Sequence, residues 1–160
     1  MNTKVLGKWQ RLCSRSEYCS ADVRRKVLKD LDGDEAAAAE VVAALEGERY
    51  VDDARYAAAF ARDKAQLSGW GAAKIRFQLR AKGISDADLA AALESVDADL
   101  AEQKLRRVLA AKARTLQGDP QIRLKLLKFA LTRGYDYDAC DAAVRTILSG
   151  GAASDADGLA

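Results

Sequence analysis

The chain of 160 residues contains no histidine. Catalytic triads built on histidine, histidine bases and histidine metal ligands are therefore excluded. Its cysteines, Cys13, Cys19 and Cys140, form no C-x-x-C pair, and their odd number argues against a disulfide framework. We expect reduced thiols and a cytoplasmic location. No apolar run approaches the roughly 20 residues that a membrane span needs, and the N-terminus lacks the unbroken apolar segment of a signal peptide.

Proline, aromatic and β-branched residues are also scarce. Pro120 is the only proline, and Phe, Trp and Tyr together make up 6% of the chain. Alanine, leucine and charged residues dominate, and this composition favours helix over sheet. The composition therefore predicts an all-α fold.

An internal repeat of about fifty residues runs through the sequence. The segments RAKGISDADLAAAL (80–93) and LTRGYDYDACDAAV (131–144) both place a basic residue and a glycine ahead of acids and an alanine-rich apolar pattern. Gly83 and Gly134 lie 51 positions apart, and Gly33 opens a weaker copy fifty positions before Gly83. We infer three tandem repeats, each built from three short helices.

The limits of these repeats follow from the residues that are expected to begin and end each helix. We place the repeats at residues 1–48, 49–97 and 98–148, and the middle repeat has the clearest pattern. Residues 149–160 lack an apolar periodicity and are predicted to form a disordered tail.

The net charge is only +2, but the sign of the charge alternates along the chain. Residues 1–29 hold eight Lys/Arg and two acids, whereas residues 30–53 hold nine acids and one Arg. A basic block (62–82), an acidic block (83–102) and a basic block (103–133) follow. The first two helices of each repeat are thus basic and the third is acidic. Stacked repeats would align the basic helices into one long cationic face, which suits a target that exposes phosphates.

The adjacent acids Asp52 and Asp53 stand just ahead of an alanine-rich run. With Asp52 as an N-cap, Val51 and Tyr56 have the spacing of a hydrophobic staple, and Asp53 lies favourably at the positive end of the helix. A catalytic pair, for example in a Mg²⁺-dependent nuclease, would need further convergent carboxylates, and the chain offers no second acidic pair with a convincing spacing. We interpret the pair as structural.

Other polar and glycine residues also predict helix ends. Ser20 and Asp119 are expected to be N-caps, and Gly83 and Gly134 suit the left-handed position that follows a helix. Gly69 and Gly71, on either side of Trp70, are expected to allow a close helix approach or a hinge. Tyr18 and Tyr137 fit no core face and are expected to be exposed.

Several of these segments together resemble the RecX family of recombination regulators. The resemblance rests on RYVDDARYAAAFARDK (49–64) and SGWGAAKIRFQLRAKGI (68–84), and it extends to SRSEYCSADVRRKVL (14–28) and KLLKFALTRGYDYDAC (125–140). One departure is the first-repeat segment KDLDGDE, where the family usually has a basic residue before the glycine. The residues that match the family pattern or the inferred helix punctuation are Tyr50, Val51, Asp52, Asp53, Tyr56, Gly69, Gly71, Ile75, Leu79, Gly83 and Gly134.

The resemblance implies an elongated, curved array of three three-helix repeats that binds the RecA filament on DNA. Such proteins lie in the filament groove and restrain strand exchange, ATP hydrolysis and the coprotease activity that triggers the SOS response. They have no catalytic residue, metal or cofactor. A monomer is our default expectation.

We expect the cationic face to contact RecA or DNA phosphates, with little sequence specificity because no base-reading motif is present. An alternative is a helical-repeat scaffold that binds DNA or another protein and does not act on RecA. The candidate contact residues are Arg24, Arg25, Lys26, Lys74, Arg76, Arg80, Lys82, Arg106, Arg107, Lys112, Arg114, Arg123, Lys125, Lys128 and Arg133.

Overall fold

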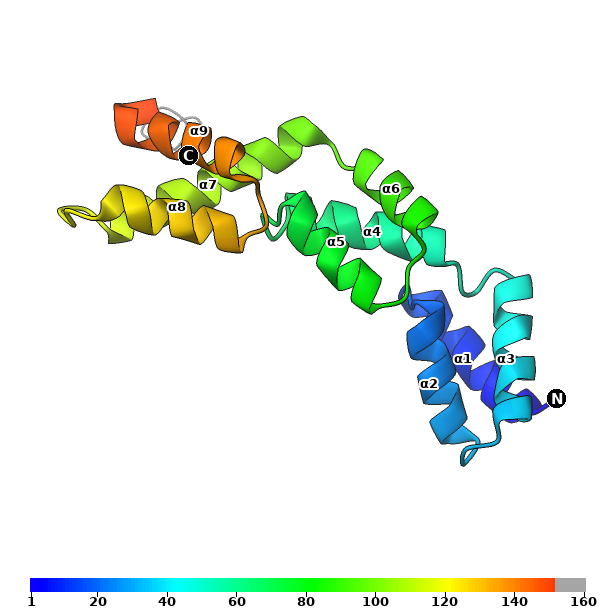
Figure 1. Ribbon diagram of the computed structural model, residues 1–160. Coiled ribbons are helices and arrows are strands. Elements are labelled where there is room, and N and C mark those ends of the chain that lie inside the picture. The colour runs from blue at the N-terminus through cyan, green and yellow to red at the C-terminus, as the bar shows by residue number, and fades with distance from the viewer. Residues whose placement is uncertain (152–160) are drawn as a thin grey trace. The chain divides into compact units, whose positions relative to one another are not determined.

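The computed structural model describes residues 1–151, which form α-helices and one terminal π-helical turn and contain no strand (Figure 1). The predicted all-α fold, a succession of three-helix groups, is confirmed. None of the helices in this range combines the length and the apolar character that crossing a membrane requires. The elements are α1 (Thr3–Arg15), α2 (Ser20–Asp30), α3 (Glu35–Gly47), α4 (Asp53–Gln66), α5 (Ala72–Ala81), α6 (Asp86–Glu94), α7 (Ala98–Thr115), α8 (Ile122–Thr132), α9 (Tyr137–Thr146) and η1 (Ile147–Gly151).

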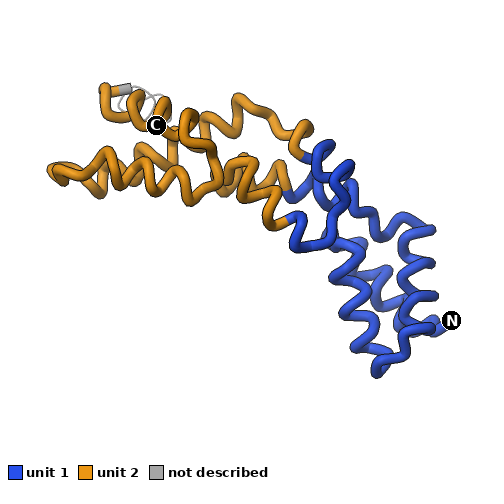
Figure 2. Tube along the Cα trace, in the orientation of Figure 1, with its two compact units in different colours: residues 1–60, 79–92 blue, residues 61–78, 93–160 orange. Residues whose placement is uncertain are grey.

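The chain divides into two compact units, coloured separately in Figure 2. Unit 1 comprises residues 1–60 and 79–92, and unit 2 comprises residues 61–78 and 93–160. The division passes through α4 and α5, so each of these helices contributes to both units. The repeat limits inferred from the sequence stay a prediction, and most of the expected tail, residues 152–160, lies outside the described residues.

The core of unit 1 lies among α1, α2 and α3. Val23 and Val27 of α2 and Leu45 of α3 are fully buried, and Trp9 of α1 is 3% exposed. Tyr18 packs against this core with its ring edge-on to Trp9, at 5.7 Å between centroids. The expectation that Tyr18 is exposed is therefore wrong, because its ring completes an aromatic pair that helical spacing alone does not show.

The core of unit 2 lies among α7, α8 and α9. Leu109, Leu126 and Val144 have no exposed surface and come one from each helix. Helix α8 begins at Ile122, two residues later than an N-cap at Asp119 implies. The Asp119 carboxylate instead accepts from Gln121 N at 2.8 Å, which closes a turn ahead of the helix.

Side chains cap most of the other helices. Asp34, Asp52 and Asp136 each accept a hydrogen bond from the backbone N–H three residues on, at 2.8–3.0 Å. The Ser85 hydroxyl does the same for Asp88 N at 3.2 Å. Ser20 is not an N-cap, because it is already the first residue of α2, and the preceding residue makes no side-chain cap.

Candidate functional site

The adjacent acids Asp52 and Asp53 act on two different helices. Asp52 caps its own helix, and the hydrogen bond from Arg55 N is the main reason that the pKa of the Asp52 carboxyl is lowered. Asp53 reaches across unit 1 to the start of α2, where its two oxygens accept from Ser20 N at 2.7 Å and Ser20 Oγ at 2.6 Å. Asp53 therefore supplies the cap that α2 lacks locally, and both carboxylates bind helix N-termini.

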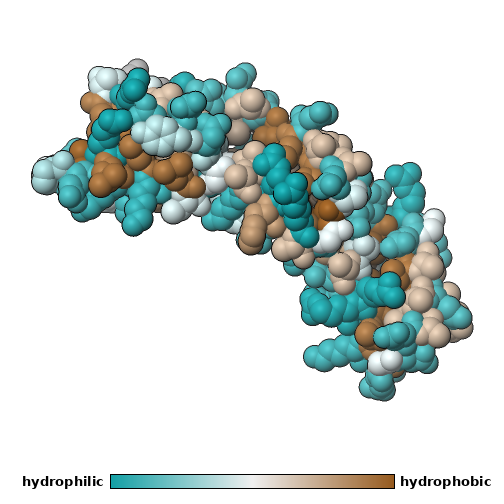
Figure 3. Space-filling model, viewed as in Figure 1, coloured by the Kyte–Doolittle hydropathy of each residue, from teal (hydrophilic) through white to brown (hydrophobic). Residues whose placement is uncertain are grey.

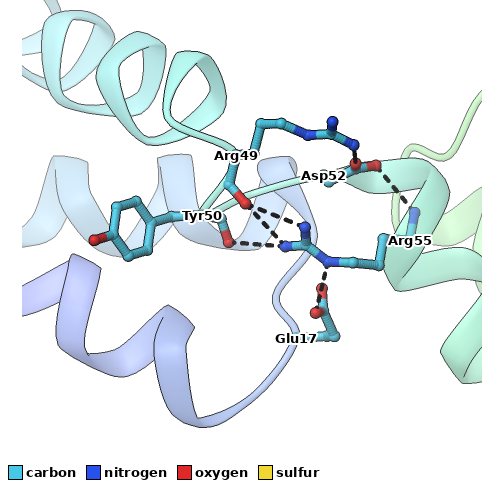
Figure 4. A network of polar contacts seen from close by, with 5 residues as sticks. All are labelled: Glu17, Arg49, Tyr50, Asp52 and Arg55. Atoms are coloured by element: carbon cyan, nitrogen blue, oxygen red, sulfur yellow. Dashed lines mark hydrogen bonds and ion pairs between the residues drawn. The ribbon is translucent and has the colours of Figure 1, made fainter.

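Arg55 ties the loop before α4 to the loop after α1 (Figure 4). Its Nε donates to a carboxylate oxygen of Glu17 at 2.7 Å, and its terminal nitrogens donate to the carbonyl oxygens of Arg49 at 3.1 Å and Tyr50 at 3.3 Å. Arg49 in turn contacts the Asp52 carboxylate at 3.4 Å. The cluster holds the connection between α3 and α4 and leaves no free carboxylate pair for a metal.

In unit 1 the end of α5 packs against the start of α2. The Lys82 ammonium lies 2.8 Å from the Asp22 carboxylate, and a Cβ at Gly83 would be 3.7 Å from Ala21 Cβ. The hydrogen bond between the two charged groups is the main cause of the lowered pKa of Asp22 and of the raised pKa of Lys82. Gly83 has φ +77°, the left-handed conformation expected after a helix.

In unit 2 the end of α8 packs against the start of α5 through the backbone. Gly71 N donates to Arg133 O at 2.6 Å, and Ala73 N donates to Gly134 O at 3.1 Å. A Cβ on Gly71 would lie 2.5 Å from the carbonyl of Gly134, and a Cβ on Gly134 would lie 2.6 Å from Lys74 N. Only glycine at both positions lets the helix ends approach this closely.

The remaining motif residues lie on buried or half-buried faces. Ile75 and Leu79 are 1% and 0% exposed, and Val51 is also buried. Tyr56 stacks on Phe60 at 6.0 Å between centroids, while Tyr50 packs against the core of unit 1. Gly69 has φ +70°, and a Cβ added to it would lie 3.5 Å from the side chains of Lys104 and Val108 on α7.

The fifteen candidate contact residues differ in the internal contacts that their charged groups make. Six form ion pairs within the described residues: Arg25, Arg80, Lys82, Arg106, Arg123 and Lys125. Four lie over aromatic rings at 4.4–5.7 Å from the centroid: Lys26, Lys74, Lys112 and Arg133.

Five candidates form neither an ion pair nor a contact with an aromatic ring anywhere in residues 1–151: Arg24, Arg76, Arg107, Arg114 and Lys128. All but Arg76 are exposed, and Arg76 is half-exposed. Exposed ion pairs contribute only about 0.2–1 kcal/mol, so the paired cations remain available at small cost. The unpaired cations need to give up no internal contact to meet an external anion.

Unit 2 also contains a cavity of about 470 Å³ with mostly alanine and other apolar walls. Its charged lining residues, Glu102 and Arg106, are paired with each other at 2.8 Å. In the part of the chain that the structure describes, no three Cys, Asp or Glu side chains gather closely enough to hold a metal ion. The cysteines are buried, and burial raises the pKa of all three thiols.

Solved structures share this fold. A crystal structure of RecX from Lactobacillus salivarius superimposes with a TM-score of 0.74 over 91% of this chain and 95% of that one, at 23% identity. A second crystal structure, of regulatory protein RecX, gives a TM-score of 0.70 at 25% identity and covers 86% of this chain and 68% of the other.

Sequence comparisons point to the same family. The family model of the second three-helix domain of RecX matches residues 52–93. A regulatory protein RecX from Clostridium perfringens (strain 13 / Type A) is 31% identical over 110 residues, which are 62% of this chain and 48% of the relative. A regulatory protein RecX from Xanthomonas oryzae pv. oryzae (strain MAFF 311018) is 34% identical over 137 residues, which are 84% of this chain and 82% of the relative. Because that match spans most of both proteins, the chain belongs to the RecX family.

Proposed function

We propose that this protein binds the RecA filament on DNA through its cationic helices and reduces the ATPase, strand-exchange and coprotease activities of RecA. Its relatives are named regulatory proteins, which supports a regulatory role. The proposal includes no reaction of its own, no cofactor, a monomeric state and a cytoplasmic location. The paired acids support the absence of chemistry, because Asp52 and Asp53 each bind a helix N-terminus.

The observation that carries the proposal is the pair of unpaired arginines on α7. Arg107 and Arg114 are seven residues apart, which places them two turns apart on one side of the helix. Leu105 and Leu109 face the core from the opposite side. Both guanidinium groups are exposed and have no internal partner among the described residues. They can therefore bind a phosphate or carboxylate without breaking an existing contact.

The test is the DNA-stimulated ATPase of RecA in the presence of increasing amounts of the protein. We expect the wild type to inhibit in proportion to its concentration, and the double variant Arg107→Glu/Arg114→Glu to lose most of that inhibition. The matched control is Lys4→Glu/Arg11→Glu, which changes the net charge equally at two exposed α1 positions that have the same spacing of seven and are not among the fifteen candidate contact residues. If the wild type left ATP hydrolysis and strand exchange unchanged, the proposal would be wrong.

Salt dependence separates this proposal from the alternative of a scaffold that binds DNA alone. If binding to duplex DNA neutralises Z phosphates, log K falls with log salt at a slope of about −0.9Z. Strong, salt-sensitive binding of DNA together with no effect on RecA would favour the scaffold. The same arginine variant should reduce that slope by about 1 for each phosphate contact that it removes.

A further inference from the structure

Phe77 is an exposed aromatic side chain in the middle of a basic helix. It is 71% exposed, as much as any large apolar residue in the described chain. Helix α5 has the sequence AAKIRFQLRA and contains three cations and no acid. Over this helix Figure 3 shows hydrophobic side chains beside long hydrophilic ones. A single exposed apolar residue is ordinary, so its surroundings decide whether it has a role.

Helix geometry places Phe77 at the centre of the solvent side of α5. The buried side is formed by Ile75 and Leu79, one on each side of Phe77 in sequence, and a step of 100° per residue directs Phe77 away from both. Ala73, one turn earlier, is too small to cover the ring. The ring faces are therefore open to solvent and do not serve the core.

The repeats show which kind of residue this position normally holds. Phe77 follows the first buried residue of its helix, Ile75, by two positions. The residues two positions after the equivalent buried Val23 and Leu126 are Arg25 and Lys128, and both are exposed. Two of the three repeats thus present a cation here, and the middle repeat presents an aromatic ring at the same place.

The groups around the ring are cationic. Lys74 lies one turn before Phe77, and Arg76 precedes it directly. The Lys74 ammonium is 4.4 Å from the centroid of the Trp70 ring, which positions it, and Lys64 lies over the same ring at 4.7 Å. A solvent-exposed ring among positive charges complements a base and its phosphates better than it complements a neutral apolar pocket.

We propose that Phe77, with Lys74 and Arg76, is a stacking contact for an unpaired base of single-stranded nucleic acid. The ring would stack on the base, and the cations would hold the adjoining phosphates. This contact goes beyond the proposed function, because it involves bases and needs no RecA. Duplex DNA, whose bases are already stacked, would use the cations alone.

The test measures binding of a fluorescently labelled oligo(dT) by anisotropy, without RecA. Three probes of equal length are compared: oligo(dT), a strand of abasic sugar-phosphate units, and a duplex. The protein variants are Phe77→Ala, Phe77→Leu and Phe77→Trp. The matched control is Leu67→Ala, because Leu67 is also 71% exposed and also lies in unit 2.

We expect Phe77→Ala and Phe77→Leu to bind oligo(dT) about 5- to 100-fold more weakly than the wild type, the range that one lost stacking contact produces. Phe77→Trp and Leu67→Ala should bind as the wild type does. Binding of the abasic strand and of the duplex should be the same for all variants. Arg76→Gln should lower the slope of log K against log salt by about 0.7, the single-strand value for one phosphate, whereas Phe77→Leu should leave the slope unchanged.

Three results would overturn the proposal. The first is binding of oligo(dT) by the wild type no tighter than binding of the abasic strand, and the second is binding of oligo(dT) by Phe77→Leu as tight as that by the wild type. The third is a loss of RecA inhibition in Phe77→Ala with oligo(dT) binding intact, which would make the ring a protein contact. Because the oligonucleotide assay contains no RecA, its outcome is independent of the proposed regulation of RecA.

Discussion

Replacing Gly134 by alanine should disrupt the contact between α8 and α5. The added Cβ would lie 2.5 Å from Lys74 Cβ and 2.6 Å from Lys74 N, and the backbone nitrogen cannot move aside as the end of a flexible side chain can. The helix ends must then separate. That separation stretches the hydrogen bonds from Gly71 N to Arg133 O and from Ala73 N to Gly134 O.

The size of the effect follows from three contributions. Alanine at φ +94° carries a left-handed strain of about 1–2 kcal/mol. Overpacking adds about 1–3 kcal/mol, and each weakened backbone hydrogen bond adds about 0.5–1.5 kcal/mol. Gly118→Ala isolates the first contribution, because Gly118 lies in the same unit at φ +80° with nothing within 4 Å of a Cβ. The destabilisation by Gly134→Ala should therefore exceed that by the control by roughly 2–6 kcal/mol.

Two measurements check this difference. For a chain of this length, 1 kcal/mol shifts the melting temperature by about 2–4 °C, so that of Gly134→Ala should lie about 4–24 °C below that of Gly118→Ala. Amide hydrogen exchange gives the local test, because the N–H groups of Gly71 and Ala73 should lose protection only in Gly134→Ala. Equal melting temperatures together with unchanged protection of these two amides would refute the close helix approach.

Three further predictions concern unit stability and the thiols. Asp53→Ala should destabilise unit 1 by about 1–2 kcal/mol, measured by urea unfolding, and speed exchange of the Ser20 amide, because α2 loses its cap. The pair of Asp22 and Lys82, partly screened by solvent, should contribute about 0.2–1 kcal/mol. Because the pKa of Asp22 is lowered, this contribution is present above about pH 4 and is lost as pH falls through the folded-state pKa of Asp22. Because the pKa of Lys82 is raised, the contribution is present below about pH 10 and is lost as pH rises through the folded-state pKa of Lys82. The stability difference between the wild type and Lys82→Met should accordingly shrink at both pH extremes; a constant difference would contradict it. A thiol reagent should modify the native protein far more slowly than the urea-unfolded protein at Cys13, Cys19 and Cys140, because burial raises the pKa of each thiol.

Helix starts that depend on neighbouring residues could be predicted from the sequence. Asp52 was predicted to be an N-cap from residue type and spacing, and Asp34 and Asp136 likewise bond to backbone N–H groups only three residues away. The cap of α2 could not be predicted in this way. Its acceptor, Asp53, lies 33 residues from Ser20, and only the packing of α4 near α2 brings them together.

The cationic residues illustrate a second limit of the sequence. Charge blocks identified the basic helices, but they could not show which cations are already engaged. Arg106 and Arg107 are adjacent in sequence, yet Arg106 pairs with Glu102 at 2.8 Å and Arg107 has no partner among the described residues. The distinction depends on the rotation of the helix, which sets whether a side chain meets a neighbour or solvent.

Gly83 and Gly134 both follow a cation at the end of a helix, but the contacts made at the two positions differ. Lys82 precedes Gly83 and pairs with Asp22, the residue just before the first buried valine of α2. In α5 the residue at the position of Asp22 is Lys74, whose positive charge repels Arg133. The Arg133 guanidinium instead donates a hydrogen bond to the carbonyl oxygen of Ser68 at 2.7 Å. The contact at Gly134 is then closed by backbone hydrogen bonds in place of an ion pair.

The first repeat has an acid, Asp32, in place of a basic residue before its glycine, and the contacts of that glycine explain why. Asp32 stands before Gly33, where Lys82 stands before Gly83 and a cation also precedes the third glycine. Gly33 has the same left-handed backbone, at φ +87°, but no described atom lies within 4 Å of where its Cβ would be. Because no helix start is packed against this position in residues 1–151, a basic residue there would have no partner to contact. The left-handed backbone alone favours glycine at position 33, whereas a cation before the glycine has a contact to make only where another helix begins beside it.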